Sequence, residues 1–194
     1  MAFEIVVIGA SSGGLKALQV ILGGLGSEFR VPLVIVQHRG KDSDPGLCEF
    51  LAQHSGLTIN EPDDKEPIHA GHVYLAPCDY HLLISDGSFA LSIDAPVAFA
   101  RPSIDLLFES AAEEYEQGVI GVVLTGSNSD GARGLAAIKA HGGLTIVEDP
   151  GTAAFREMPK AACDHSNVDW VVPLENIPPL LEQLTSSMVG NYAT

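Results

Sequence analysis

The stretch VVIGASSGGLKAL, residues 6–18, decides the fold class of this chain. An apolar run ends at Gly9, two serines then stand among three glycines, and helix-forming residues follow. This order predicts a buried strand, a tight turn and the start of a helix, which is the opening unit of an α/β domain. Such a turn either binds a phosphate group or presents a nucleophile.

Short runs rich in Val, Ile and Leu repeat along the chain and alternate with helical segments, as expected for strands buried on both faces of a parallel sheet. The expected strands are residues 4–8, 31–37, 118–125, 143–148 and 168–173, and the expected helices are residues 14–24, 45–55, 103–116, 130–141, 156–163 and 175–187. We expect one α/β domain over residues 1–194, a three-layer, doubly wound, mostly parallel sheet with an antiparallel hairpin at one edge.

The middle of the chain has a different pattern. Between about residues 57 and 95 the apolar runs are shorter, and Asp86-Gly87 separates two of them. Asp-Gly between alternating apolar runs predicts a tight hairpin. We therefore assign this whole region to an antiparallel excursion at the edge of the sheet.

Composition and charge exclude several classes of protein. The chain has 25 acidic and 10 basic residues, a formal charge of −15 and 46% hydrophobic residues. A globular protein this acidic offers no surface for nucleic acid or anionic membranes. The three cysteines form no C-x-x-C pair, which is typical of reduced thiols in a cytoplasmic protein. The first apolar run is too short to span a membrane, so no membrane insertion is expected.

Dinucleotide binding is the first interpretation of the glycine turn. GASSGG at residues 9–14 resembles the glycine loop of short-chain dehydrogenases, in which backbone amides hold a pyrophosphate. That family also uses a Tyr-x-x-x-Lys pair, and none of the four tyrosines has a lysine four residues later. The residues therefore argue against this interpretation, and we expect no cofactor.

The second interpretation is a serine nucleophile, because residues 9–13 fit G-x-S-x-G. Backbone amides at the start of the helix would stabilise an oxyanion. In α/β-hydrolases this turn comes after several strands, whereas here it follows the first strand. Ser11, His38 and Asp130 each follow an expected strand. Carboxyl ends of neighbouring parallel strands meet at one edge of a sheet, so these residues can form a nucleophile, base and orienter.

Five sequence blocks together make the chain similar to the catalytic domain of the chemotaxis protein-glutamate methylesterases, the CheB family. The blocks, in the family's order, are GASSGG (9–14), QH (37–38), AGHVYLAP (70–77), RPSID (101–105) and LTG followed by SDGA (124–132). The resemblance covers nearly the whole chain and is far more specific than one glycine loop.

The resemblance implies a role for each residue of the predicted site. Ser11 is the nucleophile, His38 the base and Asp130 the triad aspartate, with oxyanion-hole amides at Ser12 and Ser127. It implies hydrolysis of glutamate methyl esters on a protein, namely the methylated helices of chemotaxis receptors, and also deamidation of glutamine.

Two departures from the family pattern stand out. The family usually has Gly-Met-Gly where this chain has Gly126-Ser127-Asn128. A backbone donor at Ser127 survives the side-chain change, and Asn128 suits the left-handed conformation that a glycine would adopt. Family members also commonly carry an N-terminal receiver domain, whereas three residues precede the first expected strand here. We therefore expect a stand-alone relative or an excised catalytic domain.

Other interpretations of these residues stay open. Either serine of the turn could cap the first helix. Arg101-Pro102-Ser103 favours capping of the next helix, and Arg101 is also a candidate to bind a substrate carboxylate. A relative whose site has drifted could act only as a protein-binding module. The set His69, His72, Cys78 and His81 fits no standard zinc spacing, so no metal is expected.

Overall fold

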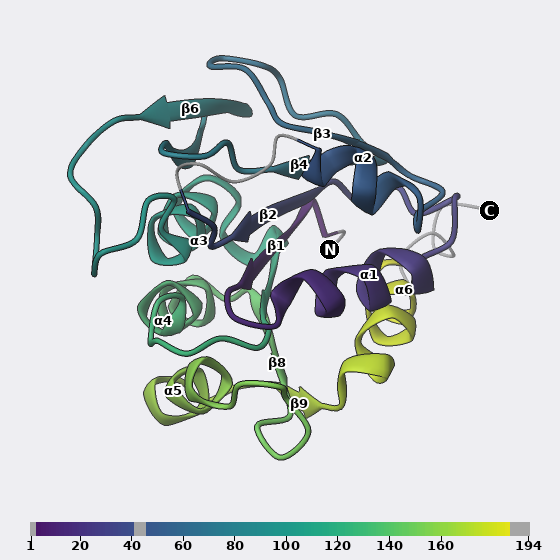
Figure 1. The fold of residues 1–194 in the computed structure, drawn as a ribbon, viewed down its shortest axis with the longest axis vertical. Coiled ribbons are helices and arrows are strands. Elements are labelled where there is room, and N and C mark those ends of the chain that lie inside the picture. Colours follow the sequence, from purple (N-terminus) through teal and green to yellow (C-terminus); the bar gives the residue numbers. More distant parts are fainter. Residues whose placement is uncertain (1–2, 41–45, 187–194) are drawn as a thin grey trace.

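The computed structural model describes residues 3–40 and 46–186, which form three layers with a parallel sheet in the middle (Figure 1). The sheet order is β3-β4-β2-β1-β7-β8-β9, and every neighbouring pair is parallel. Its strands are β1 (Ile5–Ala10), β2 (Leu33–Gln37), β3 (Thr58–Asn60), β4 (His72–Leu75), β7 (Val119–Val123), β8 (Leu144–Glu148) and β9 (Trp170–Val172). The chain winds outward from β1 in both directions, so the expected fold class is confirmed.

Helices cover both faces of the sheet (Figure 1). One face carries α3 (Ile104–Tyr115), α4 (Ala132–Ala140) and α5 (Glu157–His165). The other face carries α1 (Gly14–Gly24), α2 (Leu47–Ala52) and α6 (Ile177–Ser186). The described residues also form two short 3-10 helices, η1 (Glu116–Gly118) and η2 (Leu174–Asn176). The helices expected at 45–55 and 175–187 are both shorter, and residues 45 and 187 lie outside the described ranges.

The central strand β1 explains why its sequence is apolar without alternation. Ile5 and Val7 pack into the core on the α3 side, whereas Val6 and Ile8 pack into the core on the α1 side. All four side chains are fully buried. Because both faces of the strand are covered, each position gains from burial, about 1.5–3 kcal/mol for a side chain of this size.

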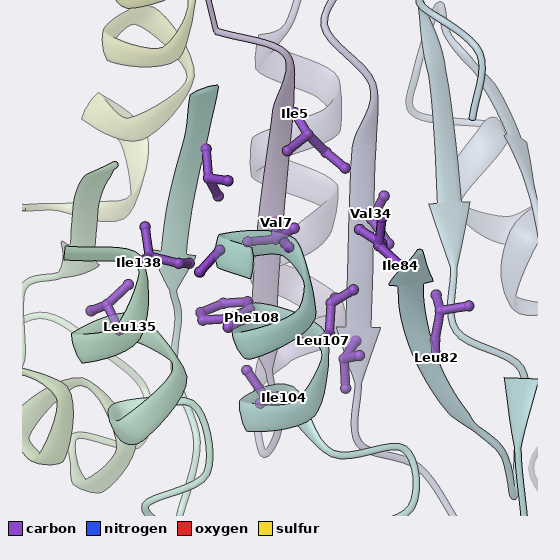
Figure 2. Close-up of a cluster of buried hydrophobic side chains, with 14 of the residues drawn as sticks. Ile5, Val7, Val34, Leu82, Ile84, Ile104, Leu107, Phe108, Leu135 and Ile138 are labelled. Carbon is purple, nitrogen blue, oxygen red and sulfur yellow. The ribbon is translucent and has the colours of Figure 1, made fainter. Parts of the chain in front are cut away.

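Figure 2 shows the core on the α3 side, where Ile104, Leu107 and Phe108 lie over β1 and β2. Leu82 and Ile84 of the hairpin enter the same cluster. Helix α3 is therefore held between the main sheet and the hairpin.

The expected antiparallel excursion is only half right. β5 (His81–Ser85) and β6 (Ser88–Ser92) form the predicted hairpin, and both turn residues have positive φ, 51° at Asp86 and 68° at Gly87. Among the described residues, this hairpin is a separate two-stranded sheet. β3 and β4 instead join the main sheet as parallel strands, so their antiparallel assignment was wrong. Strand direction depends on where the chain re-enters the sheet, which the residues of a short strand do not encode.

The strand order brings the three predicted triad segments together. β1 pairs with β2 on one side, with Ala10 beside Gln37, and with β7 on the other, with Gly9 beside Val123. The carboxyl ends of these three strands therefore share one rim of the sheet. Open α/β sheets bind their ligands at such a rim.

Candidate active site

The turn after β1 places Ser11 at this rim. The Ser11 N–H donates to the Thr125 carbonyl at 3.0 Å, and the Gly14 N–H donates back to the Ser11 carbonyl at 2.8 Å. Gly13 has a φ of 78°, and a Cβ at Gly14 would lie 2.1 Å from Gln37 Oε1. The left-handed φ of Gly13 favours glycine in the turn that presents Ser11, whereas a Cβ at Gly14 would crowd the Gln37 amide and, at 2.8 Å, the Ala10 Cβ.

His38 follows β2 and bridges the other two predicted triad residues. Its Nδ1 lies 3.2 Å from Ser11 Oγ, and its Nε2 lies 2.9 Å from Asp130 Oδ2. Gln37 fixes the backbone on both sides, since its Nε2 donates to the carbonyls of Ser11 and His38. Residues 27 and 92 positions from His38 are thus joined through a single imidazole.

Asp130 is 3% exposed, and its carboxylate accepts four hydrogen bonds. Oδ1 accepts from Ser103 Oγ at 3.0 Å and from the Asp105 N–H at 2.9 Å. Oδ2 accepts from the Ile104 N–H at 2.8 Å and faces His38 Nε2. Burial by itself raises the pKa of Asp130, but the hydrogen bonds from His38 and from the Asp105 and Ile104 amides outweigh it and lower the pKa.

An ionised Asp130 determines the tautomer of His38. A carboxylate can only accept, so Nε2 must carry the proton of the neutral ring. Nδ1 is then an acceptor directed at the Ser11 hydroxyl. The arrangement has the chemistry of a serine nucleophile with an oriented general base.

The start of α3 corrects the expected capping by Ser103. Ser103 is the N-cap residue, but its hydroxyl donates to Asp130 and makes no cap bond to the helix. Asp130 takes the capping role, because it accepts the N–H groups of Ile104 and Asp105. The helix therefore begins on the triad carboxylate.

Ser12 and Ser127 face each other across the turn, with their Oγ atoms 2.7 Å apart. Within residues 3–40 and 46–186, neither of their backbone N–H groups donates to a protein acceptor. Their expected role as oxyanion donors therefore stays a prediction with two available N–H groups.

Arg101 is held within the protein. Its Nε and Nη2 donate to Asp79 Oδ1 at 3.0 and 2.6 Å, and its Nη1 donates to the carbonyls of Ile93 and Asp94. By this count, one of its five N–H groups has no acceptor among the described residues. The expected contact with a substrate carboxylate stays a prediction, and it would have to use this remaining group.

A cavity of about 500 Å³ opens over the triad, with Ser11, His38 and Arg101 in its lining. Its rim includes Phe99, a fully exposed aromatic side chain that the sequence analysis did not select. Ala98 and Phe99 both have positive φ, 47° and 66°, and residues 97 and 100 bridge below them. A tight turn therefore places an apolar ring in the lining of the cavity that contains the nucleophile, which no local sequence signal indicates.

Asn128 is a second residue of the site, and the sequence analysis considered its backbone conformation but not its side-chain contacts. Its Nδ2 lies 3.3 Å from His38 Nδ1, and its Oδ1 accepts the Asp130 N–H at 3.1 Å. The expected left-handed conformation is wrong, because Asn128 is not among the residues with positive φ. The side chain, not the backbone, distinguishes asparagine from glycine here.

Two of the histidines considered for a metal, His72 and His81, have hydrogen-bond partners within the protein. Buried His81 accepts the Ser103 N–H on Nδ1 at 3.1 Å and donates from Nε2 to the Ala95 carbonyl at 3.2 Å. His72 bonds the Ala70 carbonyl. In the described part of the chain, no three His, Cys, Asp or Glu side chains gather as metal ligands. No helix among residues 3–40 and 46–186 is long and apolar enough to cross a membrane.

Comparisons with known proteins show the family to which this chain belongs. The profile of the CheB methylesterase family matches residues 6–181. A Leptospira interrogans protein, named as a candidate protein-glutamate methylesterase/protein-glutamine glutaminase, is 49% identical over 95% of this chain and 96% of its own length. An Anaeromyxobacter dehalogenans protein-glutamate methylesterase/protein-glutamine glutaminase is 43% identical over 94% of this chain, which spans 53% of that protein.

A solved structure has the same fold. The crystal structure of the Thermotoga maritima CheB methylesterase catalytic domain has a TM-score of 0.89 and 36% identity, and the match covers 95% of this chain and all of that one.

Proposed function

Because this chain belongs to the CheB methylesterase family, we propose that it is a serine esterase that hydrolyses glutamate methyl esters on a protein. The observation that carries the proposal is the hydrogen-bonded series Ser11–His38–Asp130 at one rim of the sheet. The proposed substrate is the methylated helices of chemotaxis receptors, in a cytoplasmic setting. Glutamine deamidation, which the names of the relatives include, is proposed as a second reaction of the same site.

In the acylation step, His38 Nδ1 takes the hydroxyl proton of Ser11 as Oγ attacks the ester carbonyl. Asp130 stabilises the resulting imidazolium through Nε2–H. The N–H groups of Ser12 and Ser127 are the proposed donors to the tetrahedral oxyanion. The intermediate collapses, the methoxy oxygen takes the proton from Nδ1, and methanol leaves.

Deacylation repeats these roles with water as the nucleophile. His38 Nδ1 takes a proton from water, the hydroxyl adds to the acyl carbon, and the bond to Ser11 Oγ breaks as Oγ regains its proton. The net reaction consumes one water and yields methanol and a glutamate side chain. Phe99 at the cavity rim is the proposed apolar contact for the protein part of the substrate.

A fluorophosphonate serine probe tests the proposal directly. Mass spectrometry of the intact protein should find one adduct on the wild type, which peptide mapping places on Ser11. Ser11→Ala should not react, while Ser12→Ala, which removes only the neighbouring hydroxyl, should react like the wild type. A folded wild-type protein that takes up no probe and releases no methanol from a methylated substrate would overturn the esterase and favour a protein-binding module.

A further inference from the structure

The amide of Asn128 contacts the nitrogen that the proposed reaction needs on His38. We propose that Asn128 is a positioning residue that holds His38 in its base-competent tautomer and moves the working pH range of the site toward acid. The inference rests on the proposed function, because it concerns the general base of that same site.

The orientation of the amide follows from its two contacts. Asn128 Oδ1 accepts the Asp130 N–H at 3.1 Å, so Nδ2 is the atom that lies 3.3 Å from His38 Nδ1. An amide nitrogen can only donate, so Nδ1 must accept. Ser11 Oγ lies 3.2 Å from the same ring nitrogen. Two donors therefore share one lone pair.

Both sides of the ring demand the same tautomer. Asp130 requires a proton on Nε2, and Asn128 requires none on Nδ1. A neutral ring with its proton on Nδ1 instead of Nε2 would lose the hydrogen bonds to both Asp130 and Asn128. Asn128 thus adds to the preference that Asp130 already imposes.

Protonation of His38 changes its contact with Asn128. An imidazolium carries N–H on both nitrogens, so its Nδ1–H would point at the NH₂ group of Asn128. The amide cannot turn its oxygen toward the ring without giving up the Asp130 N–H. Asn128 therefore disfavours protonated His38, which keeps the base active at lower pH and also opposes the imidazolium that forms during turnover.

Other charges act on His38 as well. Among the described residues, the charged side chains near the ring are Asp130, with Asp105 beside that carboxylate, Arg39 with its partner Glu61, and the Arg101–Asp79 pair of the cavity. Of these residues only Asp130 is bonded to Asn128, through its backbone N–H, a bond that Asn128→Asp can keep and Asn128→Ala loses. Because Asn128 is exposed and has no positive φ, its replacement by alanine removes the amide without straining the backbone.

The test is the pH dependence of kcat/KM for methyl ester hydrolysis in Asn128→Ala, Asn128→Gly and Asn128→Asp. Ser129→Ala, in the same exposed turn, is the matched control. The acid limb should move to higher pH by about 0.5–1 unit in the alanine and glycine variants, the size expected for one hydrogen bond. It should move further in Asn128→Asp, whose carboxylate accepts from Nδ1–H, and stay unchanged in the control.

Nitrogen-15 NMR of the His38 ring supplies a readout that does not depend on turnover. In the resting wild type Nδ1 should be unprotonated, and the pH at which the ring takes up its second proton should rise in the same order of variants. An acid limb and ring titration that are the same in wild type, Asn128→Ala and Asn128→Asp would overturn the inference. A protein that hydrolyses no ester but follows the NMR order would contradict only the proposed function.

Discussion

Asp130 and Asp105 each accept hydrogen bonds at the start of the helix that belongs to the other. Asp130 accepts the N–H groups of Ile104 and Asp105, which open α3. Asp105 Oδ1 accepts the N–H groups of Gly131 and Gly134, at the start of α4, at 2.9 and 2.8 Å. This exchange ties α3 to α4 and fixes the carboxylate that orients His38.

The two carboxylates respond to burial in opposite ways. Burial raises the pKa of Asp105, and its bonds from Gly134 and Gly131 do not offset that rise. Burial also acts on Asp130, but the bond from His38 and the backbone donors lower its pKa overall. The ionised form is therefore favoured by folding at Asp130 and disfavoured at Asp105.

Replacing each carboxylate by its amide should separate these roles. In Asp130→Asn an NH₂ group must face a donor at the start of α3, and we expect the free energy of unfolding at pH 7 to fall by about 1–3 kcal/mol. Asp105→Asn can keep both bonds through its amide oxygen; it removes a charge that folding disfavours but also the ion pair with Arg133, so its free energy of unfolding should stay within about 1 kcal/mol of the wild type. Urea unfolding measures both, and equal losses would contradict the different roles.

The same pair of variants should change how the free energy of unfolding depends on pH below pH 7. A lowered pKa means that the stabilisation from Asp130 is present above the usual carboxyl pKa and is lost as pH falls through the folded value. A raised pKa means that ionised Asp105 lowers the free energy of unfolding above its unfolded-state pKa. This loss disappears as pH falls through the folded-state pKa. Stability measured from pH 7 to 3 should lose less on acidification in Asp130→Asn and more in Asp105→Asn than in the wild type.

Ser11→Ala should lower esterase turnover by roughly 10⁴-fold or more while leaving the fold intact, as removal of a triad nucleophile does. Ser12→Ala should have a much smaller effect, because the proposed contribution of this residue is its backbone N–H. Methanol release gives the rate, and circular dichroism checks the fold. Turnover close to wild type in a folded Ser11→Ala protein would contradict the mechanism.

Phe99→Ala should separate substrate binding from chemistry. The ring is fully exposed and lies at the cavity rim, so its loss removes contact area without disturbing the core. With a methylated protein substrate we expect KM to rise about 5- to 20-fold, in keeping with a buried aromatic contact of about 1–2 kcal/mol, with kcat nearly unchanged. With a small methyl ester neither constant should change. Ile93→Ala is a matched control, since Ile93 is exposed but does not line this cavity.

Glu148→Gln should stabilise the protein at neutral pH. Glu148 is 2% exposed, burial raises its pKa, and its Oε2 accepts the Thr125 N–H at 2.7 Å. Glutamine keeps that bond and removes a buried charge, so Tm at pH 7 should rise by about 2–4 °C. A raised pKa imposes its penalty above the unfolded value, so the gain should vanish as pH falls through the folded pKa. A lower Tm at pH 7 would contradict this.

Much of the fold was predictable because its signals are local. Apolar runs without alternation indicate strands buried on both faces, and β1, β2 and β7 follow them closely. The glycines at 13 and 14 indicate a tight turn, since Gly13 has a left-handed φ and a Cβ at Gly14 would crowd Gln37 and Ala10. The position of a residue at a strand's carboxyl end then places it at the rim, which is why Ser11 and His38 could be proposed together, while the role of Asp130 rested chiefly on the resemblance to the CheB family.

The remaining features depend on contacts between distant segments. Three such features are the direction of β3 and β4, the exchange of hydrogen bonds between Asp105 and Asp130, and the contact of the Asn128 amide with His38. In each case the residues adjacent in sequence give no signal of the contact. Sequence by itself determined the elements and the kinds of side chain at the rim, since backbone sterics and burial act over a few residues. Only the tertiary structure decided which nitrogen, oxygen or amide those side chains meet, because a hydrogen bond depends on a few tenths of an ångström set by the packing of whole helices.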